Sequence, residues 1–147
     1  MTATNHALSG ALIGAFLPLP IALPVAFGSH FVLDCLPHYG IAYNKRNKST
    51  VYKLIVLCDT LVALSIAATA IFFRQWHMEI AGWVAYSPDA TWVFHYFKQG
   101  KNLQIKPMNG FMRFHRKIQR FERPWGIAVD LATTLILLPI FLFQVSK

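Results

Sequence analysis

Long apolar runs and short basic stretches alternate along the chain. Residues 54–73 and 125–144 are almost continuously apolar, and about 20 helical residues cross the roughly 30 Å hydrocarbon core of a bilayer. Residues 79–97 form a third, less apolar run. Within it, Ser87 and Pro88 suit the start of a helix, because serine is a good N-cap and proline is tolerated in the first turn. The pattern therefore predicts three membrane segments, of which the one over 79–97 is a broken helix.

The N-terminal part of the chain is also apolar, but prolines divide it. Residues 6–17 and 24–36 each cover only about 18–20 Å at 1.5 Å per residue. The LPLPIALP stretch between them is predicted to be a turn. Because irregular backbone at membrane depth must be buried in protein, we expect residues 1–38 to form a helical hairpin that dips into the bundle.

Most of the positive charge lies in two stretches that two predicted spans separate. The chain has 14 Lys and Arg, and they concentrate in a loop over 39–53 and in the region 98–124. Both stretches therefore face the same side of the membrane, which the positive-inside rule makes cytoplasmic. This predicts a multi-pass protein of the inner membrane with a cytoplasmic N-terminus.

The basic region contains a segment with a different pattern, since apolar and basic residues alternate over 108–123 with helical spacing. This composition is typical of a helix that lies in the headgroup layer. Together the patterns predict one integral-membrane domain over 1–147. Its expected fold is all-α, a polytopic membrane bundle with a short N-terminal hairpin, three membrane segments (54–73, 79–97 and 125–144) and one interfacial amphipathic helix.

Composition narrows the class of protein further. The chain is 55% hydrophobic and 14% charged, with a net charge of +8, whereas soluble domains carry about 25% charged residues. These values exclude a disordered chain and a soluble nucleic-acid-binding module. We expect membrane lipids as partners and no nucleic acid, and a complex with other membrane proteins is a further option.

The few acidic residues carry the chemical information. Of six Asp and Glu, four lie inside apolar segments, namely Asp34, Asp59, Asp89 and Asp130. An aspartate at the centre of a membrane helix costs roughly 2.5–3.5 kcal/mol, so such residues are functional candidates. The predicted topology places all four in the cytoplasmic leaflet together with several histidines.

The spacing around Asp34 indicates a metal site. His30, Asp34 and His38 follow one another at i, i+4 and i+8, which is one face of a helix. Imidazole and carboxylate groups without a cysteine pattern suit Zn, Mn or Fe. We predict a divalent cofactor, zinc first and manganese or iron as alternatives, with one or two ions. The predicted metal ligands are His6, His30, Asp34, His38 and Asp59.

Other polar residues of the same leaflet receive supporting roles. Asp89 is the candidate general base or a ligand of a second ion, and the basic rim favours an anionic substrate such as a lipid phosphate or another headgroup ester. The predicted catalytic residues are Asp89, His115 and Glu122. Arg116 and Arg123 are predicted to bind the headgroup, and His95 and Asp130 to hydrogen-bond the ligands.

Several short motifs resemble a known family. NHALSGALIGA, HFVLDCLPH, SPD and FHRKIQRFERPWG together resemble the small bacterial integral-membrane metal-dependent hydrolases, a group that includes LexA-regulated members. The resemblance implies an all-helical membrane fold and hydrolysis of phospholipid-like esters. HFVLDCLPH is also similar to part of the zinc-dependent phospholipase C signature, which implies that His30, Asp34 and His38 bind zinc.

Three functions remain open on the sequence. The leading hypothesis is a membrane-embedded metal-dependent hydrolase. The first alternative is a non-catalytic membrane subunit or assembly partner that keeps a structural metal or polar network. The second is a proton or cation transporter, which is less favoured because a conduction path needs titratable groups through the whole membrane, and here they gather in one leaflet.

Overall fold

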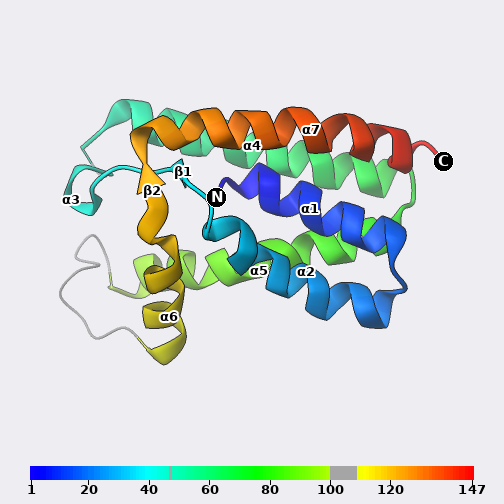
Figure 1. The fold of residues 1–147 in the computed structure, drawn as a ribbon, viewed down its shortest axis with the longest axis horizontal. Helices are drawn as coiled ribbons and strands as arrows, with labels where there is room; N and C mark the ends of the chain where they lie inside the picture. The colour runs from blue at the N-terminus through cyan, green and yellow to red at the C-terminus, as the bar shows by residue number, and fades with distance from the viewer. Residues whose placement is uncertain (47, 100–108) are drawn as a thin grey trace.

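The computed structural model describes residues 1–46, 48–99 and 109–147, and the side chains at 43, 44 and 93–99 lie outside this description. Five long helices run side by side (Figure 1): α1 (Ala3–Phe16), α2 (Leu19–Asp34), α4 (Thr50–Phe72), α5 (Trp76–Gln99) and α7 (Ile127–Val145). Short elements gather at one end of the bundle: β1 (His38–Tyr39), α3 (Tyr43–Arg46), α6 (Gly110–Ile118), η1 (Gln119–Phe121), β2 (Glu122–Arg123) and η2 (Pro124–Gly126). The prediction of an all-α fold is confirmed.

Two helices are long and apolar enough to cross a membrane, Thr50–Phe72 and Pro124–Val145. Only 11% and 17% of the residues in their apolar windows are buried, so they do not resemble the core helices of a soluble protein. Apolar surface exposed on this scale normally meets a membrane or another protein. The helix α5, over the third predicted segment, carries Glu79 and Asp89 and is not among these candidates.

The N-terminal hairpin has a tighter turn than the proline pattern predicts. Only Leu17 and Pro18 separate α1 from α2. Pro20 falls in the first turn of α2, where the missing N–H has no helical partner to lose, and Pro24 lies inside the helix. The LPLPIALP stretch is therefore mostly the start of α2 rather than a turn.

The break predicted in the segment 79–97 is not observed, since α5 is helical throughout. Pro88 has no N–H to donate to the carbonyl of Val84, which normally weakens a helix at this point. Here the hydroxyl of Ser87 donates to that carbonyl at 2.8 Å. The next carbonyl, that of Ala85, accepts a hydrogen bond from His30 Nδ1 at 2.8 Å. Side chains of Ser87 and His30 therefore supply hydrogen-bond donors to the carbonyls beside the proline.

The amphipathic helix of the basic region is shorter than predicted. α6 ends at Ile118 and is followed by η1 and β2. Because a residue before proline avoids helical geometry, Arg123 before Pro124 is extended, with φ −145° and ψ 148°. Glu122 and Arg123 pair in parallel with His38 and Tyr39. The end of the basic region thus ties the loop after α2 to the start of α7.

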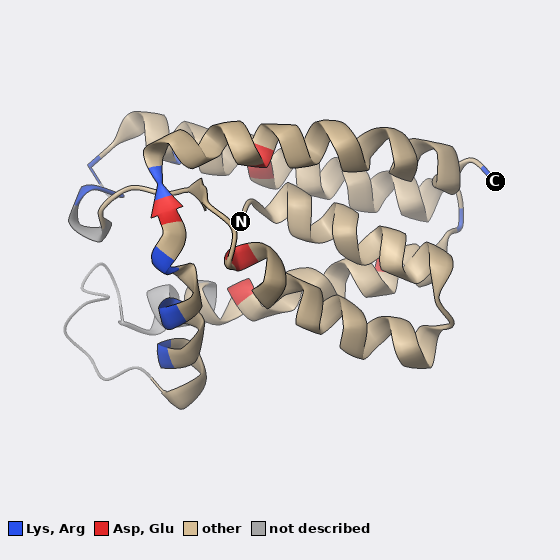
Figure 2. Ribbon diagram, in the orientation of Figure 1, with Lys and Arg blue, Asp and Glu red and all other residues tan. Residues whose placement is uncertain are grey.

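The described lysines and arginines are divided between the two ends of the bundle (Figure 2). Those of 45–53 and 113–123 lie at the end that holds α3, α6 and β2, whereas Arg74 follows α4 and Lys147 follows α7 at the other end. Long apolar helices connect the two ends. This is the charge separation on which the predicted orientation in the membrane depends.

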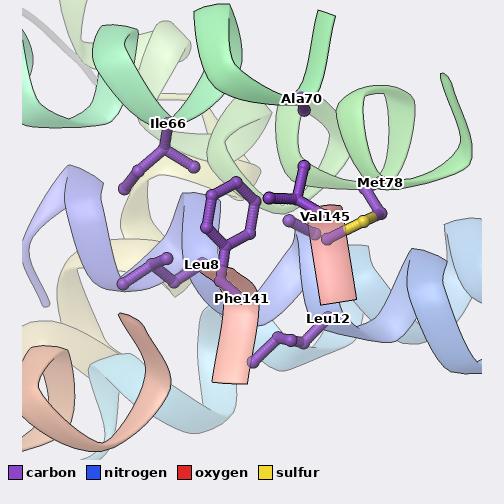
Figure 3. Close-up of a cluster of buried hydrophobic side chains, with 8 residues drawn as sticks. Leu8, Leu12, Ile66, Ala70, Met78, Phe141 and Val145 are labelled. Atoms are coloured by element: carbon purple, nitrogen blue, oxygen red, sulfur yellow. The ribbon is translucent and has the colours of Figure 1, made fainter. Parts of the chain in front are cut away.

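An apolar cluster holds the helices together at the end away from the basic residues (Figure 3). Phe141 of α7 is 1% exposed and lies between α1 and α4. The other buried members are Leu8, Ala11, Leu12, Ile66, Ala70, Met78 and Val145. This cluster fixes α1 against α4, α5 and α7, and so sets the position of the polar residues at the start of α1.

Glycines allow α1 and α5 to approach closely. A Cβ atom at Gly10 would lie 2.5 Å from the carbonyl oxygen of Ala81, and one at Gly14 would lie 2.3 Å from that of His77. Small residues four positions apart are a common way for membrane helices to pack. Both contacts are with backbone, which cannot move aside without separating the helices.

We therefore expect Gly10→Ala to lower the free energy of unfolding by about 1–3 kcal/mol, the usual cost of overpacking. Gly28→Ala is the matched control, because it changes a helical glycine with nothing within 4 Å of the new Cβ; it should be neutral or stabilising by up to about 1 kcal/mol. Thermal unfolding in detergent compares the two. Equal midpoints would contradict close packing of α1 on α5.

Candidate metal centre

Four ligand-type side chains from three helices meet near the basic end of the bundle. They are His30 and Asp34 of α2, Asp89 of α5 and His115 of α6, and one ligand atom from each lies within 4.8 Å of all the others. His30 and Asp34 are one helical turn apart and so share a face. α6 crosses the end of the bundle and brings His115 to them. These four residues are called the metal cluster below.

The distances within the metal cluster suit a common ion. His30 Nε2 lies 2.9 Å from His115 Nε2, and Asp34 Oδ2 lies 3.2 Å from the former and 3.0 Å from the latter. Asp89 Oδ1 is 3.7 Å from each of these nitrogens. In a tetrahedral zinc site with ligand distances near 2.1 Å, neighbouring donors are about 3.4 Å apart. The residues present therefore fit a divalent metal.

Hydrogen bonds to the outer ring nitrogens define the protonation of the two histidines. A carbonyl only accepts, so His30 Nδ1 must donate to Ala85, and this leaves Nε2 with a free lone pair toward the cluster. A backbone carbonyl in this position is a usual support for a metal-binding histidine. Trp92 Nε1 donates to His115 Nδ1 at 3.2 Å. His115 therefore carries its proton on Nε2 in this arrangement. Metal binding at Nε2 requires the proton to move to Nδ1, and the hydrogen bond from Trp92 must then break.

The metal cluster is largely buried, so water does little to stabilise its charges. The side chains of His30, Asp34 and His115 are fully buried, whereas that of Asp89 is 22% exposed. Two carboxylates this close together in a desolvated site repel each other unless one is protonated or a positive charge lies beside them, and a divalent cation would supply such a charge. Asp89 is the member of the cluster through which water or a ligand can approach.

His6 of α1 lies beside the metal cluster. Its Nε2 is 3.2 Å from Asp34 Oδ1, and its ring stacks on that of His30 with centroids 3.9 Å apart. Neither ring nitrogen of His6 has a hydrogen-bond partner among the described residues, although buried polar groups are normally paired. Asp34 thus presents Oδ2 to the cluster and Oδ1 to His6, where the backbone nitrogen of Met1 also contacts it.

The structure places Asp59 and Asp130, the other two aspartates of the apolar segments, around the start of α1. Asp59 accepts hydrogen bonds from the backbone nitrogens of Ala3 (2.7 Å) and Thr4 (3.0 Å), and Asp130 accepts one from the backbone nitrogen of Tyr39 at 2.7 Å. The first amides of a helix have no partner within it and attract negative charge. Asp59 therefore caps α1 and lies outside the four-residue cluster.

His38 also lies outside the metal cluster, because α2 ends at Asp34 and His38 belongs to β1. It therefore does not continue the helical face of His30 and Asp34. Its Nδ1 donates to the carbonyl of Leu36 at 2.7 Å, and its buried Nε2 has no hydrogen-bond partner in the described part of the chain.

The remaining predicted site residues lie on the rim. Glu122 forms an ion pair with Arg46, which ties β2 to α3. Arg116 and Arg123 are exposed at the basic end, and Arg123 donates to the carbonyl of Glu122 at 2.7 Å. The side chain of His95 lies outside the described residues.

Two residues at the cluster were not predicted from the sequence. Gln119 Nε2 donates to Asp34 Oδ2 at 3.2 Å, and Trp92 holds His115. Gln119 follows His115 by four residues, and residues at this spacing are neighbours on a helix. The sequence could therefore have indicated that Gln119 lies beside His115. Nothing in the local sequence distinguishes Trp92 from a tryptophan of the membrane interface.

Neither a protein-family model, nor a curated protein, nor a solved structure matches this chain. Its function must therefore be inferred from the metal cluster, from the surrounding charges, and from the resemblance of its short motifs to the small membrane hydrolases.

Proposed function

We propose that the protein is a metal-dependent hydrolase of the inner membrane that cleaves a lipid phosphate or headgroup ester at the cytoplasmic leaflet. The observation that carries the proposal is the unequal burial of the metal cluster. Three donors, His30, Asp34 and His115, are closed off, and one carboxylate, Asp89, reaches the surface. Catalytic zinc sites commonly combine three protein ligands with one open position.

Each residue then has a defined task. His30, Asp34 and His115 would hold the ion, and His6 would contact the other oxygen of Asp34. A bound divalent ion supplies Lewis-acid chemistry, because it lowers the pKa of water and polarises a phosphoryl oxygen. Asp89 takes the proton of the attacking water as the new bond to phosphorus forms and the bond from phosphorus to the leaving oxygen breaks. It can then return that proton to the leaving oxygen.

The surroundings of the metal cluster favour an anionic lipid. α6 buries His115 in the cluster and exposes Arg113, Arg116 and Lys117. Basic side chains at a membrane surface attract anionic headgroups, and the apolar helices α4 and α7 suit a position in the bilayer. The resemblance of the motifs to small membrane hydrolases points to the same substrate class.

A structural metal is the second candidate, because four donors also make up a closed four-coordinate site. In that case the protein is a non-catalytic membrane subunit, and the ion ties α2, α5 and α6 together. The two functions differ in the effect of removing the ion. A hydrolase loses turnover, whereas a structural site loses only stability.

The test measures metal and turnover on the same sample. Protein purified in detergent is expected to contain one or two divalent ions per chain by elemental analysis. In mixed micelles it should release phosphate from phosphatidic acid or the headgroup from phosphatidylglycerol. Chelation should abolish release, and zinc should restore it. A protein without bound metal contradicts the proposal, and a metal-loaded protein that hydrolyses neither lipid supports the structural alternative.

A further inference from the structure

A second feature of the bundle is a cavity of about 220 Å³ between α1, α4 and α5. Alanines on successive turns form part of its walls: Ala3, Ala7 and Ala11 on α1, and Ala63, Ala67 and Ala70 on α4. Side chains this short leave space between helices that larger residues would fill. From Ala3 to Ala11 the wall extends for about 12 Å along α1 at 1.5 Å per residue.

The cavity opens sideways, between α4 and α5. Leu64 and Trp83 both line it, and each is 49% exposed. The outer face of α4 beside this opening is apolar, with Leu57 and Leu61 more than half exposed. Since α4 is one of the two helices suited to a membrane, the opening faces hydrocarbon when the protein lies in a bilayer. A ligand that enters from this side must itself be apolar.

Polar side chains line both ends of the cavity, with Glu79 at the end away from the metal cluster and Thr60 and Tyr86 at the end nearer to it. Tyr86 precedes Asp89 by three residues, which places both on one side of α5. Thr60 directly follows Asp59, which caps α1. The Glu79 carboxylate at the other end repels an anionic headgroup, so an anionic lipid would place its headgroup at the end toward Asp89.

We propose that this cavity holds an acyl chain of a membrane lipid and directs the headgroup of that lipid toward the metal cluster. The inference rests on the proposed function, because it states where the protein binds the acyl chain, the part of the lipid substrate that does not react. A long, thin, apolar chain matches the dimensions and lining of the cavity, and the bilayer presents such chains at its opening. Remote binding of this kind positions the reacting group for catalysis.

The test fills the cavity and measures lipid binding directly. Ala67→Phe places a ring inside it, and Ala68→Phe is the matched control, because Ala68 is the next residue of α4 and is exposed. Native mass spectrometry in detergent with added phosphatidylglycerol should show one lipid bound per wild-type chain. We expect binding at least tenfold weaker in Ala67→Phe and unchanged in Ala68→Phe. Equal binding by the two variants would overturn the proposal.

Further measurements separate the possible failures. Phosphatidylglycerol with a photoreactive group in its acyl chain should crosslink wild-type protein at cavity residues, which tests the proposal even if Ala67→Phe does not fold. Crosslinks confined to the outer face of α4 would overturn it, as would a dimer that Ala67→Phe abolishes, since a second copy would then occupy the opening. Asp34→Asn should retain lipid binding, so that a failure of hydrolysis and a failure of the cavity are distinguishable.

Discussion

Replacement of Asp34 by asparagine is expected to remove the bound metal and with it all hydrolysis. Asp34 contacts His30 and His115 through Oδ2 and His6 through Oδ1, so one carboxylate connects these three histidines. An amide is a poor metal ligand and lacks the negative charge that balances the cation. Because loss of an outer hydrogen-bond partner alone lowers metal affinity by about 10–100-fold, loss of this ligand should exceed about 100-fold. Elemental analysis and lipid turnover on one preparation measure both effects.

Asp59→Asn is the matched control. Asp59 is also an aspartate within an apolar segment, but it accepts hydrogen bonds from the first amides of α1. Asparagine keeps only one of the two acceptor oxygens, so one of these backbone N–H groups loses its partner. The replacement should therefore lower stability by about 1–3 kcal/mol and leave the metal content unchanged. Loss of metal from Asp59→Asn with retention in Asp34→Asn would contradict this arrangement and return Asp59 to the ligand role that its position in the sequence predicts.

Asp89→Asn is expected to separate metal binding from catalysis. The asparagine keeps the shape of the side chain but cannot take a proton from water, and three buried donors remain to hold the ion. Because general base catalysis contributes about 10²–10⁴-fold, kcat for lipid hydrolysis should fall by that factor while metal remains bound. Asp89→Glu should recover part of the rate, because it restores a carboxylate.

The outcome also decides whether Asp89 is a ligand or a base. If Asp89→Asn loses metal together with activity, Asp89 holds the ion and the site is closed by four ligands, as the structural alternative requires. If the variant keeps both metal and full kcat, another group accepts the proton and the proposed role is wrong.

Local patterns were sufficient to predict the helices. Hydropathy over 54–73 and 125–144 indicated α4 and α7, whose apolar windows are nearly free of charge. The positions where the observed helices differ from the predicted ones contain or adjoin prolines. Pro88 was expected to break a helix, but α5 continues through it, and Ser87 and His30 donate hydrogen bonds to the nearby carbonyls of Val84 and Ala85. One of these partners lies in another helix, so local sequence does not reveal it.

By itself the sequence determined that this is an all-α chain with long apolar helices and that most of its basic residues gather in two stretches on one side, and it predicted that the aspartates of the apolar segments lie toward that side. Hydropathy and charge are properties of each segment of the chain. The order of the segments is therefore enough to predict which of them are apolar helices and which basic stretches lie on the same side. Only the tertiary structure decided which of these polar residues meet. An aspartate in an apolar helix has the same cost whether it binds a metal or caps a helix, so the sequence predicted both Asp34 and Asp59 to be metal ligands. Packing separates them, because the contact of α2 with α5 and the crossing of α6 bring Asp34 and His30 to Asp89 and His115 and leave Asp59 at the first amides of α1.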